Sequence, residues 1–335
     1  MGAAGAPHDS GHDHLRAAGP IALDAMGGDH GAAVAVAGAL RARAEYGIDT
    51  ILVGRSGELE LALKNAGESG SLAIVEASQV IAMSEDSAIA VRSKPDSSIC
   101  VAARLVAAGK ASAVVSAGPT GATLAAALLV IGRAPGVRRP VVAAVIPVVS
   151  GDRRADLVLV DAGGSADPQP DALVAFARMG IAYARVRGVS TPRVGLLNVG
   201  AEPGKGNLVA RTAHALLSEV DGFVGNTEPD AAINGAVDVL VADGFTGNVF
   251  LKTVEALGGL DESKRAGAAV LLGVAGEVLV SHGAAGEAQI ARALRSAAVV
   301  AHAGLSVRIA EQLAAASSSP EQPPATLTGA EHGAS

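Results

Sequence analysis

The chain has 335 residues, a formal net charge of −7 and few aromatic side chains, with four Phe, two Tyr and no Trp. Proteins that hold single-stranded nucleic acid stack its bases on aromatic rings and attract its phosphates with positive charge, so this composition excludes a general nucleic-acid binder. A single cysteine, Cys100, excludes an internal disulfide and a cysteine-based zinc site. Half of the residues are hydrophobic, so the chain can bury a large aliphatic core.

The two ends of the chain differ in composition from its middle. Residues 1–19 lack the basic start and apolar core of a signal peptide, and residues 317–335 form a low-complexity stretch rich in Ser and Pro. We expect disordered tails over both segments and one folded unit over residues 20–316. The longest uncharged apolar run, 124–131, is much shorter than the roughly 20 residues that span a bilayer, and it predicts a buried helix. The sequence therefore predicts a cytoplasmic protein.

From Ile21 onward, short apolar runs alternate with longer Ala-rich segments. The longer segments carry apolar residues at helical spacing, as at 32–46, 97–108 and 171–185. Such alternation predicts an α/β fold in which helices cover both faces of a mostly parallel sheet. The apolar runs predict strands at 21–25, 50–53, 73–75, 113–116, 141–146, 157–160, 194–197, 222–224, 237–241 and 277–280.

Five of the predicted strands end in a polar, glycine-rich turn. Ligands bind at the carboxyl ends of strands in an open α/β sheet, so we expect the five turns at one edge, forming one shared site. Backbone N–H groups and helix N-termini there suit an anion such as phosphate, although the glycines of any single turn are equally explained by chain reversal. No turn contains GxGxxG or a complete Walker A loop. The turns are DAMGGDHG from Asp24, SAGPTGA from Ser116, DAGGSAD from Asp161, NVGAEPGKGN from Asn198 and DGFTGN from Asp243.

Two polar side chains in these turns are candidates for chemistry. Lys205 would neutralise a bound phosphate or developing negative charge, although a solvated lysine at a helix start explains it equally well. Asn248 follows Gly247 at the start of a predicted apolar helix, so its amide would either cap that helix or donate a hydrogen bond into the site. The residues alone favour the cap.

The turns also carry carboxylates and a histidine. Asp24, Asp29, Asp161 and Asp243 would bind Mg²⁺ or act as acid or base, but such residues more commonly tie loops to backbone N–H groups. His30 would transfer a proton, contact phosphate or anchor its loop.

Six segments of the chain are similar to those of a known family. Taken in order, they closely resemble the bacterial PlsX family of phosphate acyltransferases, and they extend over nearly the whole folded region. The segments are IALDAMGGDHGA from Ile21, VRSKPDSS from Val91, SAGPTGA from Ser116, RVGLLNVGAEPGKGN from Arg193, DGFTGNVFLKTVEA from Asp243 and VSHGAAGEAQIARALR from Val280. The resemblance implies a Rossmann-like αβα sandwich of the isocitrate/isopropylmalate dehydrogenase type.

The resemblance also implies a reaction. Members of the family convert acyl-acyl carrier protein and inorganic phosphate to acyl phosphate and free carrier protein, which feeds the synthesis of phosphatidic acid and other phospholipids. The resemblance implies a cytoplasmic homodimer with peripheral contact at the membrane, where a glycerol-3-phosphate acyltransferase uses the acyl phosphate. It implies no metal, no other cofactor and no nucleic-acid partner.

The family's motifs assign roles to individual residues. The lysine of its KGN motif falls on Lys205 and the asparagine of its DGFxGN motif falls on Asn248, which implies that both are catalytic. We assign Lys205 to the phosphate and the Asn248 amide to the oxyanion formed on the thioester carbonyl. The residues expected to complete the phosphate-binding site are Asp24, Gly27, Gly28, Asp29, His30, Ser116, Gly118, Thr120, Gly121, Asp243, Gly244 and Gly247.

The chain departs from the family pattern in three places. Pro119 replaces an Asn, which removes an amide and a backbone N–H from the expected phosphate cradle. The turn DAGGSAD from Asp161 replaces DVGANVD, a milder change. Residues 258–267 stand where the family has a long amphipathic helical hairpin associated with membrane contact and dimer packing, so the shortening bears on both properties.

An acidic carrier protein needs a basic patch for docking, because this chain is itself negative. Arg133, Arg138 and Arg139 form a candidate patch, and a solvated loop is the alternative. Three other functions stay open. They are a phosphotransacylase that uses acyl-CoA, a non-catalytic relative that binds acyl groups or carrier protein, and a divalent-metal, NAD-dependent dehydrogenase of the same broad fold.

Overall fold

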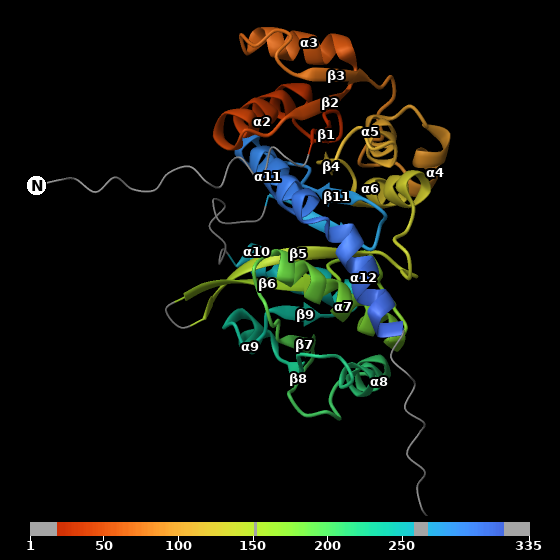
Figure 1. Ribbon diagram of the computed structural model, residues 1–335, viewed down its shortest axis with the longest axis vertical. Coiled ribbons are helices and arrows are strands. Elements are labelled where there is room, and N and C mark those ends of the chain that lie inside the picture. Colours follow the sequence, from red (N-terminus) through yellow and green to blue (C-terminus); the bar gives the residue numbers. More distant parts are fainter. Residues whose placement is uncertain (1–18, 151–152, 258–266, 318–335) are drawn as a thin grey trace, which may run out of the picture.

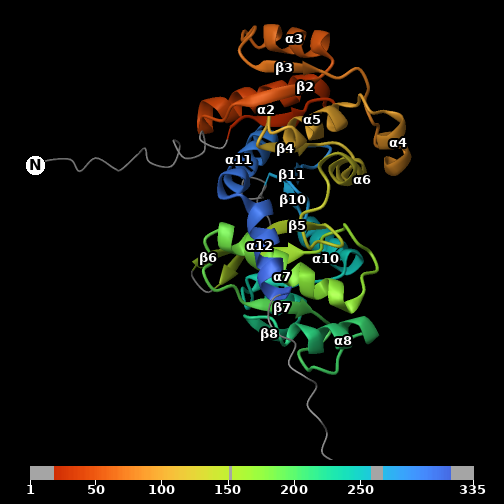
Figure 2. The ribbon, with the colours of Figure 1, turned by 45° about the vertical axis from the view of Figure 1, so that its right-hand side comes forward.

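The computed structural model describes residues 19–150, 153–257 and 267–317, which contain one 11-stranded sheet. The strands lie in the order β3-β2-β1-β4-β11-β10-β5-β6-β9-β7-β8, and helices cover both faces (Figures 1 and 2). This arrangement confirms the predicted αβα sandwich with a mostly parallel sheet.

The elements follow the alternation of the sequence. The strands are β1 (Ile21–Asp24), β2 (Thr50–Gly54), β3 (Ala73–Glu76), β4 (Ala113–Ser116), β5 (Val141–Ser150), β6 (Arg153–Val160), β7 (Val194–Leu197), β8 (Phe223–Thr227), β9 (Val239–Val241), β10 (Ala269–Leu272) and β11 (Glu277–Val280). The helices are α2 (Gly31–Tyr46), α3 (Ser56–Asn65), α4 (Ser87–Ser93), α5 (Ser98–Ala107), α6 (Thr120–Ala126), the π-helix η1 (Ala127–Ile131), α7 (Pro170–Val186), α8 (Leu208–Leu217), α9 (Pro229–Ile233), α10 (Gly244–Ala256), α11 (Glu287–Ala303) and α12 (Leu305–Ser317). β4, β7 and β11 have the predicted bounds, whereas β5 and β6 are longer than predicted and β10 was not predicted.

The sheet consists of two groups of parallel strands that run in opposite directions. β3, β2, β1, β4 and β11 are parallel to one another, and so are β6, β9, β7 and β8. Between the groups, β10 and β5 pair antiparallel with each other and with their outer neighbours. The turns after β1 and β4 therefore point the opposite way to those after β6, β7 and β9. The expectation that all five turns share one edge is wrong, because the antiparallel β5–β6 hairpin reverses the direction of the second group.

The carboxyl ends of the two groups nevertheless lie at the same height in the sheet. Ser116 at the end of β4 and Ala269 of β10 pair with the same residue of β11, which lies between them. Val160 at the end of β6 and Val270 of β10 likewise pair with the same residue of β5. Since Ala269 and Val270 are consecutive residues of β10, turns from both groups begin beside the central strands.

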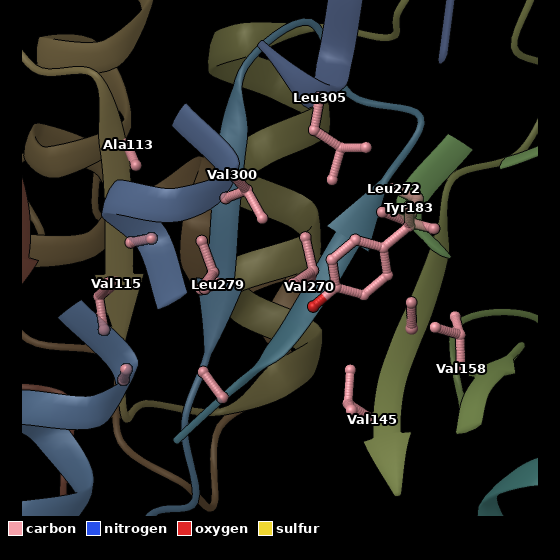
Figure 3. Close-up of a cluster of buried hydrophobic side chains, with 14 of the residues drawn as sticks. Ala113, Val115, Val145, Val158, Tyr183, Val270, Leu272, Leu279, Val300 and Leu305 are labelled. Carbon is pink, nitrogen blue, oxygen red and sulfur yellow. The ribbon is translucent and has the colours of Figure 1, made fainter. Parts of the chain in front are cut away.

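The hydrophobic core has two layers, one on each face of the sheet. α2, α3, α7, α8, α11 and α12 cover one face, and α4, α5, α6, η1, α9 and α10 cover the other. Figure 3 shows the first layer where it crosses the junction between the strand groups. Val115, Leu279, Val270 and Val145 come from four successive strands of the sheet, and Tyr183 of α7 belongs to the same buried cluster. The core is therefore continuous across the junction and mainly aliphatic, as the composition predicts.

The apolar run at 124–131 is helical, and it changes from α- to π-helix at Ala127. It is not wholly buried as predicted, since Leu129 is 53% exposed. None of the described helices combines the length and the apolar character needed to cross a membrane.

Candidate functional site

A cavity of about 670 Å³ lies beside the central strands, where the turns of the two strand groups meet. Val142 and Ala144 of β5 and Leu251 of α10 form an apolar part of its wall. The polar and turn residues of the wall include Thr120 of α6, Ala162 and Gly163 after β6, Asn248, Lys252 and Glu255 of α10, and Ser281, His282 and Gln289 after β11. Its volume is in the range of cavities that bind small molecules.

Asn248 is held at the cavity wall by the turn after β6. α10 begins at Gly244 and its N-cap is Asp243, whose carboxylate accepts hydrogen bonds from the backbone N–H and the hydroxyl of Thr246, both at 2.7 Å. The cap interpretation of Asn248 is therefore wrong. Its Nδ2 donates to the carbonyl oxygen of Ala162 at 3.0 Å. Because an amide nitrogen carries two N–H groups, a second donor remains for a ligand in the cavity.

The buried carboxylate of Asp161 organises the same turn. It accepts hydrogen bonds at 2.6 to 3.1 Å from the backbone N–H groups of Val142, Gly163, Gly164 and Ser165. Burial raises the pKa of Asp161, and the four hydrogen bonds oppose that shift. Asp161 thus ties the loop to the sheet, which is the commoner of the roles considered for such a residue.

α10 approaches this turn so closely that only glycine fits at two positions. A Cβ on Gly247 would lie 1.9 Å from the carbonyl oxygen of Asp161, and a Cβ on Gly244 would lie 2.7 Å from that of Ser165. The N–H of Gly244 donates to the same Ser165 carbonyl at 2.8 Å. The two glycines therefore let the helix sit against the turn and bring Asn248 within reach of it.

The turns after β1 and β4 contact each other through Asp24. The Ser116 hydroxyl donates to Asp24 Oδ2 at 2.7 Å and accepts a hydrogen bond from the N–H of Gly118 at 3.0 Å. A Cβ on Gly27 would lie 2.6 Å from Asp24 Oδ2 and 2.8 Å from the nitrogen of Gly118. Gly28 lies against the same turn. These residues thus hold the turns after β1 and β4 together.

The other predicted residues of this group lie around that contact. Thr120 lines the cavity, and Gly121 lies against α4. The N–H of Asp29 donates to the carbonyl of Gly283 at 2.9 Å, and Gly283 lies between the cavity-lining residues His282 and Ala284. His30 is exposed at the N-cap of α2, and its side chain makes no capping hydrogen bond there.

Asp24 is expected to make stability depend on pH. It is 4% exposed, and burial raises the pKa of its carboxyl although hydrogen bonds from Ser98 and Ser116 lower it. A raised pKa means that the folded state binds the proton more tightly than the unfolded state. The stability contributed by Asp24 is therefore present below its ordinary pKa of 3.8 and is lost as the pH rises through the folded-state pKa.

We therefore expect the free energy of unfolding of the wild type, relative to Asp24→Asn, to fall as the pH rises above 3.8. Urea denaturation of both proteins over a pH series measures this difference. Asp29→Asn, at an exposed carboxylate, is the control and should follow the wild type. A difference that grows with pH would contradict the expectation.

Lys205 lies in the turn after β7 and is not among the residues that line the cavity. Its N–H donates to the carbonyl of Glu202 at 3.0 Å, and its carbonyl accepts from Asn198 Nδ2 at 3.1 Å. The stem of the side chain passes over Gly200, where a Cβ would lie 3.0 Å from Lys205 Cγ. In the described part of the chain, no hydrogen bond joins Lys205 to Asn248, although β7 and β9 are parallel neighbours. The catalytic role of Lys205 stays a prediction.

Several residues of the site were missed from the sequence. Lys252 and Glu255 line the cavity on the same face of α10 as Asn248, and their side chains form an ion pair at 2.8 Å. The helical spacing of these three residues is a signal that could have found them. Asn226 of β8 is buried and donates to the Glu202 carbonyl at 2.7 Å, which steadies the turn after β7. No local sequence signal identifies that contact.

Known proteins match the chain in sequence and in fold. The family model described as fatty acid synthesis protein matches residues 20–260. The phosphate acyltransferase of Desulfitobacterium hafniense strain Y51 is 39% identical over 328 residues, covering 88% of this chain and 97% of that protein. The phosphate acyltransferase of Heliobacterium modesticaldum is 46% identical over 241 residues, covering 71% of each. The chain belongs to the phosphate acyltransferase family.

Membership of the phosphate acyltransferase family confirms the resemblance and makes the chain an acyltransferase of lipid biosynthesis. It disfavours the dehydrogenase alternative. The phosphotransacetylase from Streptococcus pyogenes superposes with a TM-score of 0.65 at 19% identity, covering 87% of this chain and 97% of that one. This likeness concerns the fold and confirms the predicted fold class.

Proposed function

We propose that the chain transfers the acyl group of acyl-acyl carrier protein to inorganic phosphate, giving acyl phosphate and free carrier protein for phospholipid synthesis. The observation that carries the proposal is the position of Asn248 in a protein of this family. Its amide is fixed by Ala162 at the wall of a cavity, with one N–H left to donate.

The reaction needs a donor aimed at developing negative charge. A phosphate oxygen attacks the thioester carbonyl carbon, forming a C–O bond and placing a negative charge on the carbonyl oxygen. The free N–H of Asn248 stabilises this oxyanion. The oxyanion then collapses, the C–S bond breaks, and the sulfur leaves as the thiolate of the carrier protein, which takes up a proton from water. No covalent bond to the enzyme is formed, in keeping with the buried position of Cys100.

The phosphate would be held by the turns on the other side of the cavity. Thr120 begins α6 at the cavity wall, and the turn after β1 is joined by the bond from Asp29 to Gly283, which lies between two cavity-lining residues. Pro119 is the N-cap of α6 and has no backbone N–H, so the first N–H groups of this helix come from Thr120 and Gly121. We assign the positive charge for the phosphate to Lys205, on the basis of the family's KGN motif.

The choice of acyl donor tests the proposal directly. Purified protein is mixed with phosphate and either long-chain acyl-acyl carrier protein or acyl-CoA, and acyl phosphate is measured. We expect formation from the carrier-protein thioester that depends on phosphate. Formation from acyl-CoA alone would indicate a phosphotransacylase, and binding of the carrier protein without turnover would indicate a non-catalytic relative.

Two lysines can be compared as matched variants. We expect Lys205→Ala to lower kcat/KM for phosphate about 10²-fold, because it removes the charge assigned to that substrate. Lys252→Ala should change it by less than about threefold, since Lys252 is exposed and already paired with Glu255. Steady-state kinetics with varied phosphate measures both. A larger loss of kcat/KM for phosphate in Lys252→Ala than in Lys205→Ala would assign phosphate binding to Lys252 instead.

We further propose that the protein is a cytoplasmic homodimer that contacts the membrane surface, where a glycerol-3-phosphate acyltransferase takes up the acyl phosphate. The homodimer and the membrane contact are what the family resemblance implies. The shortened connection expected at 258–267 lies, apart from Gly267, outside the described residues. Sedimentation of the purified protein, alone and with lipid vesicles, tests these two properties separately.

A further inference from the structure

A second cavity, of about 450 Å³, lies on the α6 side of the sheet. We call it the arginine groove. Its apolar wall comes from Leu124, Leu128 and Leu129 on α6 and η1. Its remaining lining residues are Arg133, Arg138, Arg139, Pro140, Gly164 and Ser165.

The arginine groove lies next to the cavity that contains Asn248, because neighbouring residues of the same segments line the two spaces. On the helix, Thr120 lines the cavity, and Leu124 and Leu128, at four-residue spacing on the same helix face, line the groove. On the turn after β6, Gly163 lines the cavity and the next residue, Gly164, lines the groove. Val142 of β5 lines the cavity, and Pro140, just before β5, lines the groove. Three segments thus place the groove beside the cavity whose wall includes Asn248.

The charges of the arginine groove contrast with the net charge of −7 of the whole chain. Arg133 donates to the carbonyl of Arg138 at 2.9 Å, and Arg139 donates to the Ser165 hydroxyl at 3.0 Å, so these two guanidinium groups are fixed to the rim. The side chain of Arg138 is 90% exposed, and it contacts the exposed carboxylate of Asp171 at 3.2 Å. The rim is therefore a local patch of positive charge open to solvent.

We infer that the arginine groove docks the acidic carrier protein that delivers the acyl thioester, and that the thioester arm passes along the leucines to Asn248. The inference rests on the proposed function. Three arginines at the rim complement an acidic protein surface, and long-range attraction of this kind raises the rate of encounter. The exposed Leu129 offers an apolar contact beside the charges, which a docked partner covers.

Charge reversal at Arg138 tests the inference. We expect Arg138→Glu to raise KM for acyl-acyl carrier protein about tenfold and to reduce its dependence on salt, with the rate on acyl-pantetheine, which lacks the carrier, unchanged. Lys64→Glu is the matched control, because Lys64 is exposed on α3, away from the groove, and the charge change is the same. An unchanged KM, or an equal loss with acyl-pantetheine, would overturn the docking assignment.

Binding measured without turnover separates this inference from the proposed function. Calorimetry with carrier protein alone should show binding to the wild type and to Lys64→Glu, with weaker binding to Arg138→Glu and to Leu129→Ser. That result would support the groove even if no acyl phosphate is formed. Binding of anionic lipid vesicles in place of the carrier protein, lost in Arg138→Glu, would show that the patch serves a membrane and would overturn the inference.

Discussion

Asn248→Ala is expected to lower kcat for acyl transfer to phosphate by about 10²–10³-fold, since it removes the N–H donor that we assign to the oxyanion. The substituted protein should fold, because only one hydrogen bond, to the Ala162 carbonyl, is lost from a half-buried side chain. KM for acyl-acyl carrier protein should change little, because the interaction is made chiefly in the transition state. Steady-state release of acyl phosphate measures these quantities.

The control for this substitution lies on the same helix. Thr253 is exposed, and its hydroxyl donates to the carbonyl of Val249 at 2.8 Å. It is not among the residues that line the cavity. Thr253→Ala should keep near-native kcat. If Asn248→Ala also keeps near-native kcat, the amide does not stabilise the oxyanion and the assignment fails.

Gly247→Ala is expected to have the largest effect on stability. The added Cβ would lie 1.9 Å from the carbonyl oxygen of Asp161, which is a backbone atom held in place by the bonds around that turn. Either α10 or the turn after β6 must move, so we expect the free energy of unfolding to fall by about 3 kcal/mol or more. Activity should fall with it, because the same displacement carries Asn248 away from Ala162.

Urea denaturation measures the loss in the free energy of unfolding caused by Gly247→Ala, and Gly204→Ala is the comparison. Gly204 is exposed in the turn after β7, and a Cβ there meets no atom within 4 Å. This variant should match the wild type in stability to within about 0.5 kcal/mol. Equal stability of the two alanine variants would show that α10 and the turn are not in the close contact described.

The sequence predicted the fold class because alternating apolar runs and helical segments are local patterns. It did not predict the direction of the second strand group. That direction depends on the pairing of β5 with β6 and on β10. The apolar run of β10 is only four residues long, and such a run cannot be told from a buried helical segment by its periodicity. The prediction that all five turns lie at one edge of the sheet is wrong for this reason. The placement of each turn at the end of a strand is correct.

The candidate site was predicted in part. The residues alone favoured a helix cap at Asn248, and the family motif reversed that preference. In the structure Asp243 caps α10, and the Asn248 amide donates to Ala162 at the cavity wall. That partner is 86 residues away in the chain, so no local pattern could identify it. Lys205 was singled out by the family motif, and its role stays a prediction that the Lys205→Ala kinetics would test.

The position of β11 has a consequence for the order in which the chain folds. β11 is near the end of the chain, yet it pairs with β4 of the first strand group, and α11 packs against α2. While the protein is being synthesised, β4 keeps an unpaired edge and α2 an uncovered face until residues 277–303 leave the ribosome. An exposed edge of buried apolar residues is prone to pairing with other chains. A protein truncated before β11 would retain this exposed edge and would tend to aggregate.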